Sequence, residues 1–306
     1  TSKWQWNINA NISYNKNQIM QLPDGNKTVV EDNRYLMVGQ PINSFRLSQY
    51  NGIYLNEDMI PFDPYTGLKY KNESGQYVQV GWADYEDVDK DNQYVSWKDK
   101  KPIGDPNPKW VGGLNTNLSY GPWSLFVQTS FTLGRDILNT QFAKTMAPLS
   151  AQYGADEEGV GFSGGPGANY ANPADGHWYY AEDFVARRMM VDLSRYSFWQ
   201  KDGDNTNYPS RSQYMNNNNF IERSSLFLEN GSYLKLNTIM LSYNLDKLKK
   251  WGINNARLSL TAENVAIIKS KNTLAADPSN VSPDGYYTGN GYGLPRKFTI
   301  GLMFDF

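Results

Sequence analysis

The feature that most constrains this chain is the alternation of apolar and polar residues near its start, in WQWNINANISY (4–14). Large apolar side chains occupy nearly every second position, and the positions between them carry uncharged Gln, Asn and Ser. A period of two is the signature of a β-strand, because successive side chains point to opposite faces of a sheet. This stretch alone is compatible with a half-buried strand of a soluble protein and with a membrane-spanning strand.

Two details of the stretch favour a membrane. Its polar face is rich in amides and carries no charge, as the wall of a watery interior would. Its apolar face has aromatic residues at both ends, Trp4 and Trp6 at one and Tyr14 at the other. Ten residues rising ~3.4 Å each and tilted ~40° span roughly 26 Å, close to the ~25 Å apolar band that lies between the aromatic girdles of outer-membrane barrels.

The alternation recurs along the chain. The pair Gly121-Pro122 separates two alternating segments and predicts a tight hairpin. The segment 232–245 changes face near Asn237 and Thr238, which predicts a β-bulge, because one extra residue reverses the faces that side chains occupy. We expect about seven to nine strands. The clearest lie near 3–19, 42–54, 109–120, 123–134, 232–245, 255–268 and 296–306.

Composition excludes several classes of site. The chain has no cysteine and one histidine, His177, which rules out disulfides, thiol nucleophiles and metal sites built from Cys or several His. The net charge of −2 argues against a nucleic-acid partner held through its phosphates. Mean hydropathy is −0.64 and no apolar run approaches the ~20 residues of a spanning helix, but a β-barrel hides its membrane signal in alternation.

The connections between the expected strands fall into two length classes. Some are short turns, and three are very long, near 55–108, 135–231 and 269–295. Compact soluble domains rarely contain loops of this size, whereas outer-membrane barrels combine short periplasmic turns with long extracellular loops. Loops of this total length are too large for a closed barrel of only seven to nine strands. We therefore expect these strands to form part of the wall of a larger barrel.

The end of the chain, KFTIGLMFDF, alternates strictly and stops on an aromatic residue. It resembles the C-terminal signal that the barrel-assembly machinery reads in bacterial outer-membrane barrels. An ordinary final strand of a soluble β protein is the other interpretation. The residues that would form the signal are Phe298, Ile300, Leu302, Phe304 and Phe306.

Several longer stretches together resemble one family, the SusC/RagA-type TonB-dependent transporters. The most extensive is IGDPNPKWVGGLNTNLSYGPWSLFVQTSFTLGRDILN (103–139). The others are VGQPINSFRLSQYNGIY (38–54), NGSYLKLNTIMLSYNL (230–245), RLSLTAENVAII (257–268) and GLPRKFTIGLMFDF (293–306). They occur in family order and cover nearly the whole chain.

The resemblance implies an all-β fold, with residues 1–306 forming the C-terminal portion of an antiparallel transmembrane β-barrel of the plugged class with ~22 strands. It implies import of oligosaccharides or peptides across the bacterial outer membrane, without catalysis. The implied partners are a SusD-like surface lipoprotein acting as a lid, the remaining strands and plug, TonB through a segment expected upstream of this chain, the barrel-assembly machinery and membrane lipid. The alternatives are a soluble, secreted glycan-binding module and, less favoured, a secreted glycoside hydrolase.

An acidic stretch, DVDKDNQYV, is a candidate cation site. Asp87, Asp89 and Asp91 match positions 1, 3 and 5 of an EF-hand-like loop, which offers oxygen ligands to Ca²⁺. The twelfth position is Lys98, which cannot ligate a cation, and Asp99 comes one residue late. A solvated acidic turn is the alternative interpretation.

Aromatic residues concentrate in the longest loop. They could contact substrate, contact the lipoprotein lid or simply pack the loop together, and the sequence leaves these three roles open. They are Trp178, Tyr179, Tyr180, Trp199, Tyr208 and Tyr214. In the same loop, GFSGG (161–165) fits a nucleophile-elbow pattern, with Asp175 and His177 following in the order of a hydrolase triad. An elbow needs a strand before the Ser and a helix after it, and Gly and Pro surround Ser163, so we do not expect an enzyme.

Overall fold

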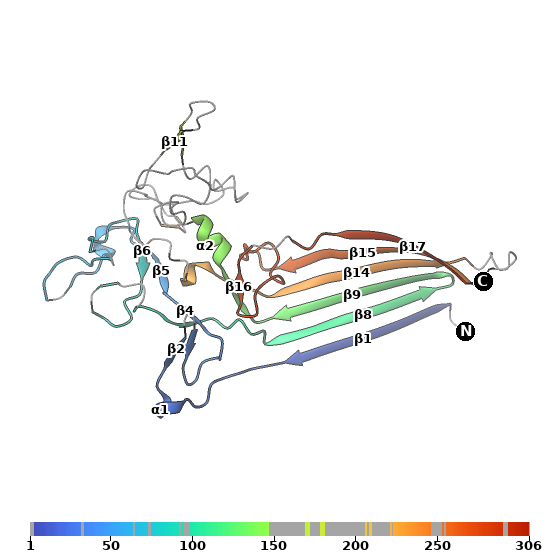
Figure 1. Ribbon diagram of the computed structural model, residues 1–306, viewed down its shortest axis with the longest axis horizontal. Coiled ribbons are helices and arrows are strands. Elements are labelled where there is room, and N and C mark those ends of the chain that lie inside the picture. Colours follow the sequence, from blue (N-terminus) through green and yellow to red (C-terminus); the bar gives the residue numbers. More distant parts are fainter. Residues whose placement is uncertain are drawn as a thin grey trace.

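The computed structural model gives the chain a long six-stranded antiparallel sheet, with smaller sheets and short helices gathered at one end of it (Figure 1). The structure describes the chain except residues 1–2, 32–33, 64, 73–74, 92, 95–97, 147–168, 172–177, 181–205, 207, 210–220, 222, 246–252, 254, 290–292 and 306. Within the described residues, no helix is both long and apolar enough to cross a bilayer.

The six strands of the long sheet follow one another in the order in which they occur along the chain. They are β1 (Trp4–Tyr14), β8 (Trp110–Tyr120), β9 (Trp123–Leu133), β14 (Tyr233–Asn244), β15 (Asn255–Lys269) and β17 (Lys297–Asp305). Each pairs with the next in antiparallel fashion, and the Gly121-Pro122 turn joins β8 to β9 as predicted. Among the described residues β1 and β17 each have one partner strand, so the sheet is an open piece of wall rather than a closed barrel.

The remaining elements are short and lie at the end of the sheet opposite the Gly121-Pro122 turn (Figure 1). The strands are β2 (Val29–Glu31), β3 (Arg34–Leu36), β4 (Phe45–Leu47), β5 (Tyr50–Ile53), β6 (Ala83–Tyr85), β7 (Lys101–Ile103), β10 (Asp136–Asn139), β11 (Asn169–Ala171), β12 (Trp178–Tyr180), β13 (Leu228–Asn230) and β16 (Tyr286–Tyr287). The helices are α1 (Pro23–Asn26), α2 (Thr140–Met146) and two 3₁₀ turns, Glu57–Met59 and Ser225–Phe227.

One expected strand of the wall is not in it. The segment 42–54 divides into β4 and β5, which belong to two different small sheets outside the long one. Its alternation serves a local core instead, because Phe45 and Leu47 are almost completely buried there against Leu138 and Phe227. The prediction of a single strand at 42–54 is therefore wrong, although the six other predicted strands are confirmed.

The predicted β-bulge is confirmed. Against β9 the register of β14 shifts between Leu236 and Thr238, which leaves Asn237 as the extra residue. Against β15 the register shifts at the same place, where Asn264 and Val265 lie between the partners of Leu236 and Thr238. Leu234 and Leu236 then face the same side as Ile239 and Leu241, although the two pairs are separated by an odd number of positions. The bulge thus keeps one face of β14 apolar along its whole length.

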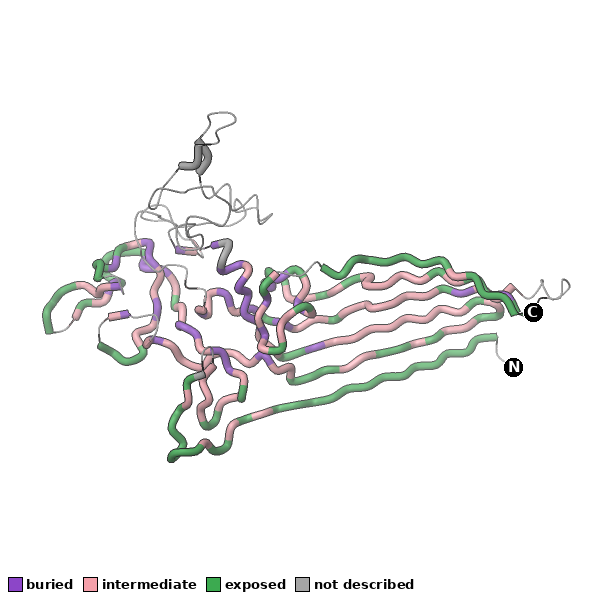
Figure 2. Tube along the Cα trace, in the orientation of Figure 1, coloured by how far each residue is buried: buried purple, intermediate pink, exposed green. Residues whose placement is uncertain are grey.

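The buried core lies in the connections and not in the long sheet. Figure 2 shows most buried residues gathered where the small elements pack, while the long strands are mostly exposed or half-buried. The largest cluster is Phe45, Leu47, Leu138, Phe142, Ala143, Met146 and Phe227. The connections predicted as long loops therefore contain packed structures of their own.

Glu229 ties two of these connections together. Its carboxylate accepts hydrogen bonds from the backbone N–H groups of Leu274 and Ala275, both at 3.0 Å, and from Asn139 Nδ2 at 2.8 Å. Burial raises the pKa of Glu229, and these donors partly oppose that rise. A buried acceptor with three donors fixes the 269–295 connection against β10 and β13 at the end of the sheet.

Candidate functional site

The register aligns apolar residues of all six strands into rows on one face of the sheet. One row near the Gly121-Pro122 turn is Trp4, Tyr120, Trp123, Tyr243, Leu258 and Leu302. A row near the middle is Ile8, Thr116, Val127, Ile239, Ala262 and Phe298. Much of this face is exposed: Trp6 and Ile12, which also lie on it, are 66% and 67% exposed, and Phe298 is 79% exposed. So large an exposed apolar surface indicates contact with lipid or another protein.

Aromatic rings border this face at both ends. Near the turn, ring centroids lie 4.4 Å apart for Trp4 and Tyr120 and 4.6 Å apart for Trp123 and Tyr243. At the other end, Tyr14 and Trp110 lie 4.6 Å apart. Amphipathic rings in two bands at the edges of an apolar surface are the pattern of a sheet that crosses a membrane.

The hydroxyl of Thr116 interrupts the apolar face near its middle, and the structure shows how it is accommodated. Trp6 Nε1 donates a hydrogen bond to Thr116 Oγ1 at 2.7 Å. In apolar surroundings neither the indole N–H nor the hydroxyl would have another hydrogen-bond partner, so each satisfies the other. The register places Thr116 on the same face as Leu114, Leu118 and Tyr120.

The opposite face of the sheet is polar and rich in side-chain amides. Asn7 pairs with Asn117, and in the next row Asn9, Asn115 and Gln128 lie side by side. A depression of about 450 Å³ lies on this face, in the half nearer the packed connections. Its polar lining includes Asn9, Asn11, Asn115, Gln128, Ser130 and Asn237.

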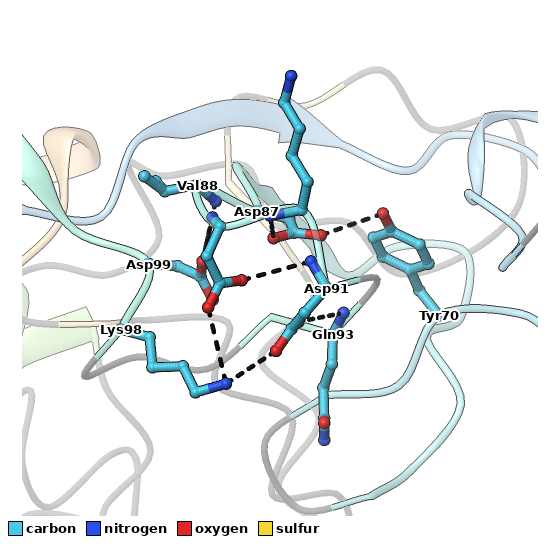
Figure 3. A network of polar contacts seen from close by, with 9 residues as sticks. Tyr70, Asp87, Val88, Asp91, Gln93, Lys98 and Asp99 are labelled. Atoms are coloured by element: carbon cyan, nitrogen blue, oxygen red, sulfur yellow. Dashed lines mark hydrogen bonds and ion pairs between the residues drawn. The ribbon is translucent and has the colours of Figure 1, made fainter.

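The acidic loop holds three carboxylates together, but not the three that sequence spacing predicted. Oxygen atoms of Asp87, Asp89 and Asp99 lie within 4.8 Å of one another (Figure 3). Asp99 is fully buried and accepts a hydrogen bond from the backbone N–H of Val88 at 2.8 Å. Asp99, which follows the twelfth position of the EF-hand-like loop by one residue, therefore belongs to the carboxylate cluster. Three carboxylates at this separation offer the oxygen ligands that Ca²⁺ prefers.

Asp91, the third residue of the predicted set, pairs with Lys98 instead. Lys98 Nζ donates to Asp91 Oδ2 at 2.8 Å and lies 3.7 Å from Asp89 Oδ2 (Figure 3). The hydrogen bond from Lys98 lowers the pKa of Asp91, and the same bond raises the pKa of Lys98. Lys98 thus places a positive charge beside the carboxylate cluster.

The aromatic residues proposed as contacts are placed only in part. Trp178, Tyr179 and Tyr180 form β12, which pairs with β11. The Tyr208 ring packs edge-on against Phe142, with centroids 6.0 Å apart, beside the largest core cluster, and this favours loop packing for Tyr208. Trp199 and Tyr214 lie outside the described residues, as do Ser163, Asp175 and His177.

The alternating end of the chain forms β17. Phe298, Ile300, Leu302 and Phe304 share the apolar face and are between 41% and 79% exposed, while Phe306 lies outside the described residues. Their use as an assembly signal remains a prediction.

Comparison with known proteins agrees with this architecture. No family model matches the chain. The TonB-dependent receptor P26 of Formosa agariphila is 25% identical over 322 residues, covering 100% of this chain and 28% of the relative. The TonB-dependent receptor P3 of the same organism is 25% identical over 321 residues, covering 98% of this chain and 27% of the relative. The chain thus spans little more than a quarter of the length of the curated relatives it matches.

Solved structures give the same fold. The RagAB peptide importer in its open-open state matches with a TM-score of 0.60 at 19% identity, over 100% of this chain and 27% of that chain. Its closed-closed state matches with a TM-score of 0.59 at 18% identity, over 99% of this chain and 28% of that chain. The chain is thus similar in sequence to TonB-dependent receptors and similar in fold to the RagAB peptide importer. Its six long strands correspond in fold to part of a transporter barrel of this type.

The two faces of the long sheet predict different responses to the same substitution at adjacent positions. In the full-length transporter, Val127→Arg places a charge in the middle of the apolar face, whereas Gln128→Arg places it on the polar face. We expect Val127→Arg to destabilise the protein in a bilayer by about 2–4 kcal/mol and Gln128→Arg to cost much less. Urea unfolding in lipid vesicles measures the difference. Equal free energies of unfolding for the two variants would contradict this assignment of the faces.

Proposed function

We propose that this chain forms part of the barrel wall of a bacterial outer-membrane importer for large nutrients, either oligosaccharides or peptides. The observation that carries the proposal is the division of one sheet into a bare apolar face bordered by aromatic rings and an amide-rich polar face. In a membrane, lipid covers the first face and the second lines a watery passage. The similarity of the chain to TonB-dependent receptors supports this function.

The proposed partners follow from the same account. The open edges of β1 and β17 need further strands, because a long unpaired edge exposes a row of backbone hydrogen-bonding groups. The rest of the barrel and its plug supply those strands and gate the passage. A SusD-like surface lipoprotein serves as the lid, TonB supplies energy, and the barrel-assembly machinery reads the end of β17. The RagAB peptide importers that share this fold support the pairing with a lipoprotein.

The alternative functions fit the structure less well. A soluble glycan-binding module would have to hide the apolar face, yet Trp6, Ile300 and Phe298 are 66%, 75% and 79% exposed. A glycoside hydrolase would need a pair of carboxylates flanking a substrate site. Among the described residues, the depression on the polar face is lined by amides, hydroxyls, backbone and the apolar residues Ile12 and Val111, and by no carboxylate.

Uptake by living cells tests the proposal. Cells that carry the full-length transporter and its lipoprotein are given fluorescent oligosaccharides and peptides, with and without TonB. We expect accumulation of one substrate class that depends on TonB, and transporter that stays in the membrane after carbonate washing. Release of the protein by carbonate, or uptake indifferent to TonB, would contradict the proposal.

For the acidic loop we propose that Asp87, Asp89 and Asp99 hold a Ca²⁺ ion that fixes the connection between β6 and β7. The proposal is supported by the convergence of three carboxylates, one of them buried. A divalent cation lowers the cost of holding like charges together. Lys98 competes for the same negative charge, since its ammonium lies 3.7 Å from Asp89.

Calorimetric titration of the full-length transporter with Ca²⁺ measures this site. We expect Asp89→Asn to weaken binding by about tenfold or more, because one charged ligand is lost, and Lys98→Met to strengthen it by removing the competing charge. Asp58→Asn, which changes an exposed carboxylate outside the cluster, is the control and should bind as the unaltered protein does. No heat of binding in the unaltered protein would refute the cation site.

A further inference from the structure

The depression on the polar face is a built feature of the wall, because three separate parts of the sequence create it. Gly113 on β8 points no side chain into it, and a Cβ added there would lie 2.8 Å from the carbonyl oxygen of Thr129. Asn237, the extra residue of the β14 bulge, enters from the other side and donates from Nδ2 to Ser130 Oγ at 2.9 Å. The side chains of β1 complete the lining.

The lining is uncharged and offers paired hydrogen-bonding groups. Each carboxamide of Asn9, Asn11, Asn115 and Gln128 has an acceptor oxygen and two N–H donors. Lys235 pairs with Ser130 in the register of β14 and β9, and its ammonium lies 3.8 Å from Asp277 Oδ2 and donates to Ser279 Oγ at 3.2 Å. The depression therefore suits a neutral ligand that has both N–H donors and carbonyl acceptors.

The spacing of the amides matches an extended peptide. Asn9 and Asn11 alternate along β1 and both line the depression, so their side chains lie ~6.8 Å apart on this face. An extended polypeptide repeats its backbone N–H and C=O groups at the same ~6.8 Å interval. A sugar chain would be expected to use an aromatic platform, and none of the described residues that line the depression is aromatic.

From these observations we infer that the depression is a binding subsite for an extended, uncharged stretch of peptide cargo on its way through the wall. The inference rests on the proposed import function and narrows its substrate class to peptides. Backbone groups of the cargo bond the carboxamides of β1, β8 and β9, so the subsite selects for an extended backbone and not for particular side chains. Its place in the half of the sheet nearer the packed connections puts it close to one mouth of the passage.

Substitution by leucine tests the subsite, because leucine keeps the size of asparagine and removes its hydrogen bonds. The probe is a fluorescent Gly-Ser octapeptide with both ends blocked, titrated into the full-length transporter with its lipoprotein. We expect the double variant Asn9→Leu/Asn115→Leu to weaken binding by about tenfold, since two or more hydrogen bonds are lost. The matched control is Asn7→Leu/Asn117→Leu, a cross-strand pair on the same face but outside the depression, and its affinity should stay within about twofold.

Three results would overturn the inference. The two double variants could bind the octapeptide equally well, or a neutral maltohexaose could bind in place of the peptide and respond to Asn9→Leu/Asn115→Leu. A photocrosslinker attached through Ser130→Cys could instead join the transporter's own chain when no cargo is present, which would make the depression a seat for its plug. If the double variant fails to assemble, the single change Gln128→Leu replaces it, with an expected loss of about threefold.

The uptake experiment with living cells, with and without TonB, distinguishes failure of this inference from failure of the import function. TonB-dependent uptake that persists unchanged in Asn9→Leu/Asn115→Leu would remove the subsite and leave the importer intact. Loss of all TonB-dependent uptake in the unaltered protein would remove the importer as well.

Discussion

The antiparallel register of the long sheet is the constraint on which the rest of the structure depends. The alternation of apolar and polar residues within one strand gives only that strand an apolar face and a polar face. Only a register that sets Trp4 against Tyr120, and Tyr120 against Trp123, joins those faces into a continuous apolar surface and a continuous polar one. A slip of one residue in any pair would move amides into the apolar surface. The bulge at Asn237 meets the same constraint. The alternation of apolar residues in β14 shifts by one position there, and the extra residue keeps the apolar side chains on one face.

Much of this fold can be predicted from the sequence because the strand signal is local. Six strands, the hairpin at Gly121-Pro122 and the bulge near Asn237 follow from a period of two and its one interruption. The period does not say what an apolar face packs against. The segment 42–54 alternates as the wall strands do, yet its residues Phe45 and Leu47 turn toward a core built by the connections.

The candidate sites were harder to predict because each joins residues that are distant along the chain or out of register with a motif. Counting positions in the acidic loop indicated Asp91 and left out Asp99, whereas the path of the loop brings Asp99 to Asp87 and gives Asp91 to Lys98. The depression forms because Gly113 of β8, which has no side chain, lies near Asn237, the extra residue of β14. Only the register between the strands, which the sequence of any one strand does not contain, reveals that proximity.

The packed connections give this wall a structured end. Their apolar clusters, together with the hydrogen bonds that Glu229 accepts from Leu274 and Ala275, hold the short elements against the ends of the long strands. The long sheet has almost no core of its own, so its stability depends on what covers its apolar face and completes its edges. A wall of this kind is a stable structure in a bilayer and an unstable one in water.

The central claim is that lipid covers the apolar face while water reaches the polar one. Spin labels placed one at a time at Ser124, Leu125, Phe126 and Val127 of the full-length transporter in lipid vesicles test it most directly. The account predicts that collisions with oxygen, which concentrates in lipid, are frequent for labels at Leu125 and Val127. Collisions with a water-soluble nickel complex should instead be frequent at Ser124 and Phe126. Uniform accessibility to either reagent along the four positions would contradict the account.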